Sequence, residues 1–83
     1  MKIQVTQKNI DLGLRGSCSR DPVSLAMKDA GFFQVWVSPA RVSWIDKFAR
    51  FHEVSTPEDV LQFMKSFDNE TFVEPFEFLL EEA

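Results

Sequence analysis

The chain has 83 residues, of which 45% are hydrophobic and 27% are charged, and its formal net charge is −4. A chain of this length predicts a single domain over residues 1–83 with a small core. Because the sequence contains one cysteine and one histidine, an intramolecular disulfide and a structural zinc site within one chain are both excluded.

The charge is divided unevenly along the chain. Residues 1–50 carry eight Lys and Arg against four Asp, and residues 51–83 carry one Lys against nine Asp and Glu, so the two parts have net charges of +4 and −8. An acidic surface repels phosphate and attracts basic surfaces. This division therefore predicts a partner with a basic surface and disfavours direct binding of nucleic acid.

The first half of the chain predicts a strand, a short helix and a longer helix. Residues 2–6 alternate polar and apolar, which indicates a half-buried strand. Thr6 and Gly13 fit the cap and the stop of one helical turn. After a loop over 14–20, Asp21 and Pro22 fit the N-cap and the first position of a second helix, which ends at Gly31.

The second half predicts a hairpin, a helix and a last strand. Residues 33–38 alternate as a strand, 38–41 form a turn, and a second strand begins at residue 42 and continues, with room for a bulge, to residue 54. Thr56 and Pro57 fit the N-cap and the first position of a third helix, as Asp21 and Pro22 do for the second. A last strand follows Pro75. The expected core consists of Val23, Met27, Phe33, Val35, Val37, Phe63, Met64, Phe67, Phe76 and Phe78.

The expected fold class is α+β. The order β-α-β-β-α-β predicts one antiparallel sheet with both helices on one face, the split-βαβ or ferredoxin-like arrangement. Proline cannot donate to a strand ladder, so Pro75 suits the start of an edge strand.

Trp36 is the best single candidate for a functional residue. The alternation directs its side chain to the open face of the sheet, beside Gln34, where an exposed aromatic residue can anchor a protein partner. A register shifted by one residue would instead place Trp36 in the core. The acidic residues expected to share the partner-binding site are Glu74, Glu77 and Glu81.

Two alternative functions follow from other residues. A nucleic-acid-binding module would use the basic residues of the first half, and a thiol enzyme would use Cys18 with His52, oriented by Asp46. The basic residues of the first alternative are Arg15, Arg20, Arg41, Lys47 and Arg50. Nothing in the spacing indicates a cofactor or a metal, so the sequence predicts a non-enzymatic protein without either.

The location is predicted from the cysteine content and the apolar runs. One unpaired cysteine fits a reducing compartment. The segment after Met1 has no long apolar run, and no stretch is long enough to span a membrane. We therefore expect a soluble, cytoplasmic protein.

Several segments resemble a group of small proteins encoded by tailed phages and prophages. They are Val5-Thr6-Gln7, Ile10-Asp11, Gly13, Gly16-Ser17-Cys18, Asp21-Pro22-Val23, Leu25-Ala26, Phe67-Asp68 and Val73-Glu74-Pro75-Phe76-Glu77-Phe78. The resemblance implies a phage origin and an infected or lysogenic bacterial host. Small acidic phage proteins often inhibit host defence, anti-CRISPR proteins among them. By that analogy we expect a protein that binds and inhibits a host protein, such as a nucleic-acid-handling complex.

Overall fold

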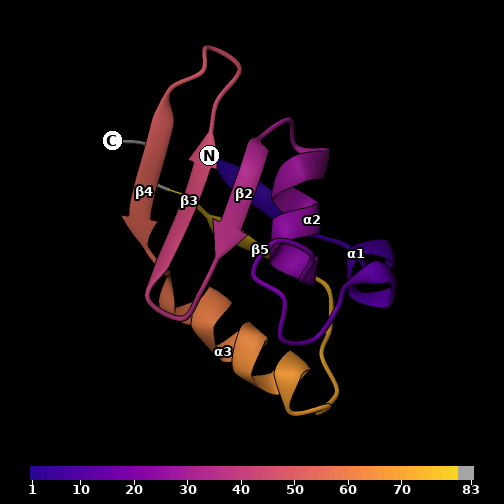
Figure 1. The fold of residues 1–83 in the computed structure, drawn as a ribbon. Coiled ribbons are helices and arrows are strands. Elements are labelled where there is room, and N and C mark those ends of the chain that lie inside the picture. Colours follow the sequence, from indigo (N-terminus) through magenta and orange to yellow (C-terminus); the bar gives the residue numbers. More distant parts are fainter. Residues whose placement is uncertain (81–83) are drawn as a thin grey trace.

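The computed structural model describes residues 1–80 and contains eight helices and strands. Figure 1 shows their arrangement along the chain. In chain order they are β1 (Lys2–Val5), α1 (Gln7–Leu12), α2 (Pro22–Asp29), β2 (Phe33–Val37), β3 (Arg41–Ile45), β4 (Phe51–Ser55), α3 (Glu58–Asp68) and β5 (Phe76–Leu79).

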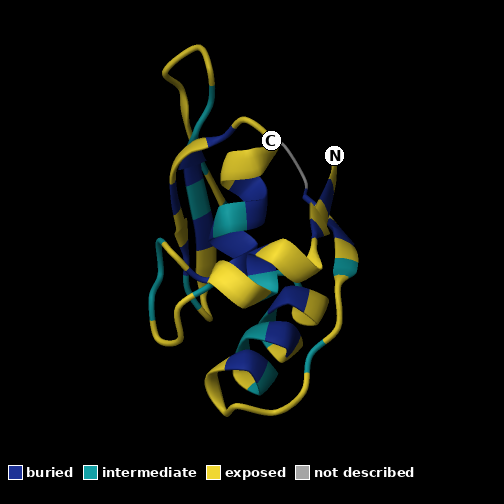
Figure 2. Cartoon of the chain, turned by 90° about the vertical axis from the view of Figure 1, so that its right-hand side faces the viewer, coloured by how far each residue is buried: buried dark blue, intermediate teal, exposed yellow. Residues whose placement is uncertain are grey.

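The strands form two separate antiparallel sheets. β1 pairs with β5 in a two-stranded ribbon, and β2, β3 and β4 pair in that order in a three-stranded sheet. Helix α2 packs against both β1 and β2, and it lies between the ribbon and the three-stranded sheet (Figures 1 and 2). The α+β class expected from the sequence is therefore confirmed.

The single ferredoxin-like sheet is not formed. Helix α2 buries Val23, Ala26 and Met27, and it contacts a strand of each sheet. Because this helix separates β1 from β2, the backbone of the ribbon cannot join the three-stranded sheet. The exposed faces of the two sheets consequently point to opposite sides of the molecule (Figure 2).

The two N-terminal helices begin and end where the sequence predicts. The Thr6 hydroxyl accepts a hydrogen bond from the backbone N–H of Asn9 at 3.2 Å, and the Asp21 carboxylate accepts one from that of Ser24 at 2.6 Å. A Cβ at Gly13 would lie 2.6 Å from Pro22 Cδ. Glycine is therefore required at this position, because the loop returns directly over the start of α2.

One apolar core connects both sheets and the helices. Seven of the ten expected core residues are buried, while Met64 and Phe76 are half-buried against the core and Phe33 is exposed. Phe63 stacks on Phe76 with ring centroids 4.7 Å apart, which joins α3 to the ribbon. The other buried apolar residues are Ile3, Val5, Ala26, Phe32, Val42, Trp44, Val60 and Leu80.

The strand expected from residue 42 to residue 54 is interrupted. β3 ends at Ile45 and β4 begins at Phe51, and the chain reverses between them. Asp46 organises this reversal, because one of its oxygens accepts the backbone N–H groups of Phe48 and Arg50 at 2.8 and 3.0 Å. Side-chain acceptors of this kind compete with a strand ladder.

The predicted Thr56 cap of α3 is wrong. The N-cap is Pro57, which makes no side-chain cap hydrogen bond, and within the first turn the Asp59 carboxylate accepts the backbone N–H of Val60 at 2.9 Å. The Thr56 hydroxyl instead donates to the carbonyl oxygen of Ser38 at 2.6 Å. It therefore ties the start of α3 to the turn between β2 and β3.

We expect Thr56→Val to lower the free energy of unfolding by about 1 kcal/mol, because valine keeps the shape of threonine but leaves the Ser38 carbonyl without its donor. Urea denaturation would measure the change. Thr71→Val, at an exposed threonine, is the matched control. Equal stability of the two variants would contradict this role of Thr56.

Candidate functional site

Strand β2 contains a bulge that changes which side chains face outward. Its pairing with β3 passes from Phe33 opposite Ile45 to Trp36 opposite Ser43, so β2 has one residue more than its partner over this stretch. Gln34, inside the bulge, has a φ of 46°. A bulge of this kind shifts the alternation of side chains by one position.

The bulge explains why the prediction of Phe33 as a core residue is wrong. Phe33 is 54% exposed, whereas its neighbour Phe32 is buried and packs edge-on against Trp44, with ring centroids 5.6 Å apart. Val35 is buried and Trp36 is 55% exposed. Phe33 and Trp36 therefore both project from the outer side of the sheet.

A row of apolar side chains crosses this outer side. Phe33 lies opposite Ile45, and Ile45 lies opposite Phe51. Directly opposed residues project to the same side of a sheet. Phe51 is 66% exposed and Ile45 is half-buried. We call Phe33, Trp36, Ile45 and Phe51 the aromatic face.

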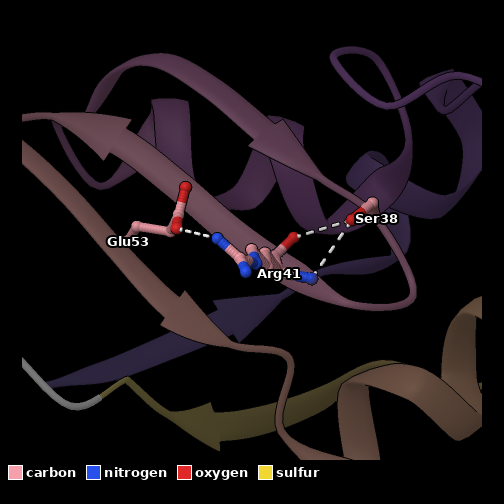
Figure 3. A network of polar contacts seen from close by, with 3 residues as sticks. All are labelled: Ser38, Arg41 and Glu53. Carbon is pink, nitrogen blue, oxygen red and sulfur yellow. Dashed lines mark hydrogen bonds and ion pairs between the residues drawn. The ribbon is translucent and has the colours of Figure 1, made fainter.

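An ion pair borders the aromatic face. The guanidinium of Arg41 on β3 contacts the carboxylate of Glu53 on β4 (Figure 3), and the side chain of Arg41 is more exposed than that of Glu53. Ser38 closes the turn beside them, because its hydroxyl accepts the backbone N–H of Arg41 at 3.1 Å. Glu53 lies opposite Ser43, which in turn lies opposite Trp36. The pair therefore neutralises most of the charge next to Trp36.

The loop between β3 and β4 adds an exposed aromatic ring with two cations. The ammonium of Lys47 lies 5.4 Å and the guanidinium of Arg50 lies 5.7 Å from the centre of the Phe48 ring. Both distances allow cation–π attraction. We call Lys47, Phe48 and Arg50 the basic loop. It directly precedes Phe51, so it adjoins one end of the aromatic face.

His52 supports this loop from the inner side of the sheet. Its Nε2 lies 2.7 Å from the second oxygen of Asp46, and its ring stacks on that of Trp44 with centroids 5.1 Å apart. The hydrogen bond with His52, helped by the backbone N–H groups of Arg50 and Phe48, holds the pKa of Asp46 below its ordinary value against the opposing effect of burial. Asp46 therefore stays ionised and accepts hydrogen bonds from both sides of the loop.

The residues predicted as the partner-binding site lie on different parts of the molecule. Trp36 and Gln34 are exposed on β2, whereas Glu77 is exposed on β5 of the ribbon. Glu77 already contacts Lys2 at 3.7 Å and Gln4 at 3.2 Å. The structure thus pairs the Glu77 charge with its neighbours in the ribbon and separates it from Trp36.

The structure describes one of the other two predicted acidic residues. Glu74 is exposed in the segment between α3 and β5, and Glu81 lies outside the described residues.

The sequence analysis identified Trp36 but not the other aromatic residues of the site. It predicted one strand from residue 42 to residue 54, and a continuous strand leaves no loop at residues 46–50. The run Lys47-Phe48-Ala49-Arg50-Phe51, in which cations alternate with aromatic residues, was the available signal.

Some residues of the two alternative functions are engaged in contacts within the protein. Arg15 donates its Nε to the carbonyl oxygen of Phe67 at 3.1 Å and lies 4.0 Å from Glu70. Cys18 lies beside Val37 at the end of β2, whereas His52 contacts Asp46. The structure therefore does not assemble a thiol–imidazole pair.

Among residues 1–80, no group of three or more His, Cys, Asp or Glu side chains is arranged to hold a metal ion. Nor does this part of the chain include a helix with the length and apolar character needed to cross a membrane.

Comparisons with protein-family models, with curated proteins and with solved structures find no match to this chain.

Proposed function

We propose that this chain is a non-enzymatic binding protein that docks a protein partner on its aromatic face. The observation that carries the proposal is the row of Phe33, Ile45 and Phe51 across three strands, with Trp36 beside it. A folded monomer rarely leaves a contiguous apolar patch of this kind open to water unless the patch binds something. Trp and Phe anchors are enriched in protein interfaces.

The size of the patch supports a protein partner. An aromatic side chain can bury roughly 150–250 Å². Phe33, Trp36, Phe48 and Phe51 are each more than half exposed, so together they offer roughly 400–500 Å² of ring surface. A stable interface uses about 800 Å² on each partner, and the flanking polar residues can supply the rest.

The charges around the face indicate what the partner presents. Lys47 and Arg50 lie at one end, while Arg41 is already paired with Glu53. We infer a partner surface with apolar side chains at its centre and carboxylates opposite the basic loop. This differs from the basic partner surface expected from the net charge, because the carboxylate of Glu77 lies on the ribbon and is paired with Lys2.

Single-stranded nucleic acid is the competing occupant. Exposed aromatic rings on a sheet stack with bases, and nearby cations bind phosphates. The net charge of −4 opposes this, and the Arg41 cation beside Trp36 is already paired with Glu53. The resemblance to phage proteins suggests that the partner is a protein of a bacterial host. We propose that binding inhibits this host protein.

We expect Trp36→Ala to weaken partner binding by about 2 kcal/mol, or about thirtyfold, mainly through faster dissociation. The physical reason is the loss of a large aromatic anchor that becomes desolvated in the complex. The protein would be immobilised, partners captured from bacterial lysate, and the rate constants of the captured protein measured by surface plasmon resonance. Phe72→Ala is the matched control, because Phe72 is 82% exposed and lies in the segment between α3 and β5.

A captured protein supports the proposal only if Trp36→Ala and Phe51→Ala both lose it while Phe72→Ala retains it. Binding that all three variants share would contradict the proposal. Retention of a labelled oligonucleotide by the parent and its loss in both face variants would assign the face to nucleic acid. Sedimentation of the parent as a dimer and of Trp36→Ala as a monomer would assign it to a second copy of the chain.

A further inference from the structure

The outer edge of β4 carries backbone groups that point away from the sheet. The N–H of Thr56 donates to the Ala40 carbonyl oxygen at 3.2 Å, and the N–H of Asp46 donates to that of Arg50 at 3.0 Å. β3 and β4 pair without a shift of register between these two bonds, and hydrogen-bonded pairs alternate with non-hydrogen-bonded pairs along an antiparallel ladder. The backbone groups of residues 52 and 54 therefore face β3, whereas those of residues 51, 53 and 55 face outward.

This edge is the less protected of the two outer edges of the three-stranded sheet. Natural sheets protect an edge with a bulge, a proline, a charged side chain or a covering segment. β2 contains the bulge, and on its outer edge the N–H of Val37 donates to the Cys18 carbonyl oxygen at 2.7 Å. β4 has neither bulge nor proline, and the charge of Glu53 is paired with Arg41. Among residues 1–80, β3 is the only strand paired with β4, which lies at the margin of the sheet (Figure 1).

Side chains of an added strand would find contacts on both sides of this edge. On the outer side, Phe51 is 66% exposed and ends the apolar row of the aromatic face. Val54 projects to the opposite side, because side chains alternate along a strand. A hollow of about 480 Å³ lies beside it, lined by Val54, Ser55, Thr56, Pro57 and Leu79. Alternate side chains of an added strand would therefore contact Phe51 and enter this hollow.

The charges along the edge indicate which strand fits. The cations of Lys47 and Arg50 directly precede Phe51 in the chain. A strand antiparallel to β4 passes Arg50 after it passes Phe51, so carboxylates at its C-terminal end would lie beside the basic loop. A second copy of this chain fits less well. Antiparallel pairing of two β4 strands over their full length places the two Glu53 side chains directly opposite each other, and opposed like charges are destabilising.

We propose that an extended segment of the protein partner adds to β4 as a fourth, antiparallel strand of the sheet. The segment has apolar residues opposite Phe51 and Val54, followed by carboxylates beside the basic loop. Backbone hydrogen bonds to residues 51, 53 and 55 hold it, and its alternate side chains provide the selectivity. This inference rests on the proposed docking at the aromatic face and adds the way in which the partner binds there.

The probe is the heptapeptide acetyl-TLTTIED-amide, whose isoleucine lies opposite Phe51 and whose leucine lies opposite Val54 in the proposed register. Amide NMR would follow its titration into the protein. We expect a dissociation constant on the order of 1 mM, because the free peptide must be ordered. At about 10 mM peptide about nine-tenths of the protein is bound, so solvent exchange should slow by at least about fivefold at the amides of 51, 53 and 55. The amides of 52 and 54, already bonded to β3, should not change.

Two N-methylated peptides provide a matched control that leaves the protein unaltered. Methyl groups on the third and fifth amide nitrogens of TLTTIED remove donors that face β4, and we expect binding to weaken by at least about tenfold. Methyl groups on the fourth and sixth nitrogens face away from β4 and should have little effect. Acetyl-TLTTIQN-amide, which lacks the carboxylates, is expected to bind about threefold more weakly, as exposed ion pairs contribute little.

Ser55→Pro is the principal variant of the protein. It removes one outward N–H and places the proline ring on the edge, while the ladder bonds to β3 come from other residues. We expect it to weaken TLTTIED binding by at least about tenfold. Ser55→Ala loses the hydroxyl but keeps the N–H, so it should bind as the parent does. Circular dichroism would establish that both variants are folded at the temperature of the titration.

Several outcomes would overturn the proposal. They are TLTTIED shifts that do not saturate up to about 10 mM, equal binding of the two N-methylated peptides, or exchange that slows equally at all residues from 51 to 55. Equal binding of TLTTIQN would contradict the contact of carboxylates with the basic loop. A parent that sediments as a dimer and a Ser55→Pro variant that sediments as a monomer would assign the edge to a second copy.

A protein captured from bacterial lysate distinguishes strand addition from docking at the aromatic face. If Trp36→Ala loses the captured protein while Ser55→Pro retains it, docking at the aromatic face stands and strand addition is wrong. If Ser55→Pro loses it while Trp36→Ala and Ser55→Ala retain it, strand addition stands and the proposed role of Trp36 is wrong. Loss in both Trp36→Ala and Ser55→Pro, with retention in Ser55→Ala and Phe72→Ala, is the result that we expect.

Discussion

Replacing Trp44 with alanine is expected to lower the free energy of unfolding by about 3–5 kcal/mol. Trp44 is 1% exposed and is the largest fully buried side chain. Its ring packs edge-on against Phe32 and stacks on His52, so truncation removes apolar burial and leaves a cavity at the centre of the three-stranded sheet. A domain has a total stability of about 5–15 kcal/mol, and this variant would lose a large part of it.

The neighbouring strand provides the control. Trp36→Ala removes the same kind of side chain from the exposed side of β2, and we expect it to change the free energy of unfolding by less than about 1 kcal/mol. Urea denaturation of the parent and both variants would measure the difference. Similar losses in the two variants would mean that β2 and β3 do not have the described register.

The stability of the protein is expected to fall as the pH rises through the range from about 4 to about 6. The pKa of Asp21 rises from an ordinary value of 3.8 to about 6 on folding, chiefly because the carboxyl group is buried. In this range the folded protein binds more protons than the unfolded chain, so deprotonation favours unfolding. A rise of this size corresponds to about 3 kcal/mol lost above pH 6.

Asp46 does not interfere with this measurement. Its pKa is lowered on folding, so the stability that it contributes is present above pH 3.8 and is lost only as the pH falls further. Melting temperatures between about pH 4.5 and pH 8 would test the Asp21 effect. Asp21→Asn keeps the acceptor for Ser24 and should show a flatter profile, with a higher melting temperature than the parent at pH 8. A parent profile as flat as that of Asp21→Asn would contradict the assignment.

Local signals in the sequence located the helices more accurately than the strands. Thr6 and Asp21 accept the backbone N–H groups expected of N-caps, because a cap depends on residues within one turn. Thr56 has the same local pattern but bonds Ser38 instead. A carbonyl brought close by the tertiary fold competes for its hydroxyl, and no pattern near residue 56 reveals that competitor.

Both errors in the predicted sheet arise from features that no local sequence pattern predicts. The alternation of Phe33, Val35 and Val37 is compatible with a regular strand, and Gln34 carries no mark of the positive φ that produces the bulge. The division into two sheets depends on α2 packing against β1 and β2 together, which is a property of distant segments. Trp36 was correctly placed on the open side of the sheet, whereas its neighbours Phe33 and Phe51 depended on the bulge and on the loop at 46–50.

The β1–β5 ribbon has a consequence for folding. It pairs Lys2 with Leu79, and the backbone N–H of Leu80 donates to the Met1 carbonyl oxygen at 2.8 Å. All the other helices and strands that the structure describes lie between β1 and β5 in the chain, so Ile3 and Val5 enter the ribbon only when these two distant segments meet. The hairpins of the three-stranded sheet join segments that are adjacent in the chain and cost less loop-closure entropy. Closing the ribbon therefore costs more chain entropy than any other strand pairing within residues 1–80.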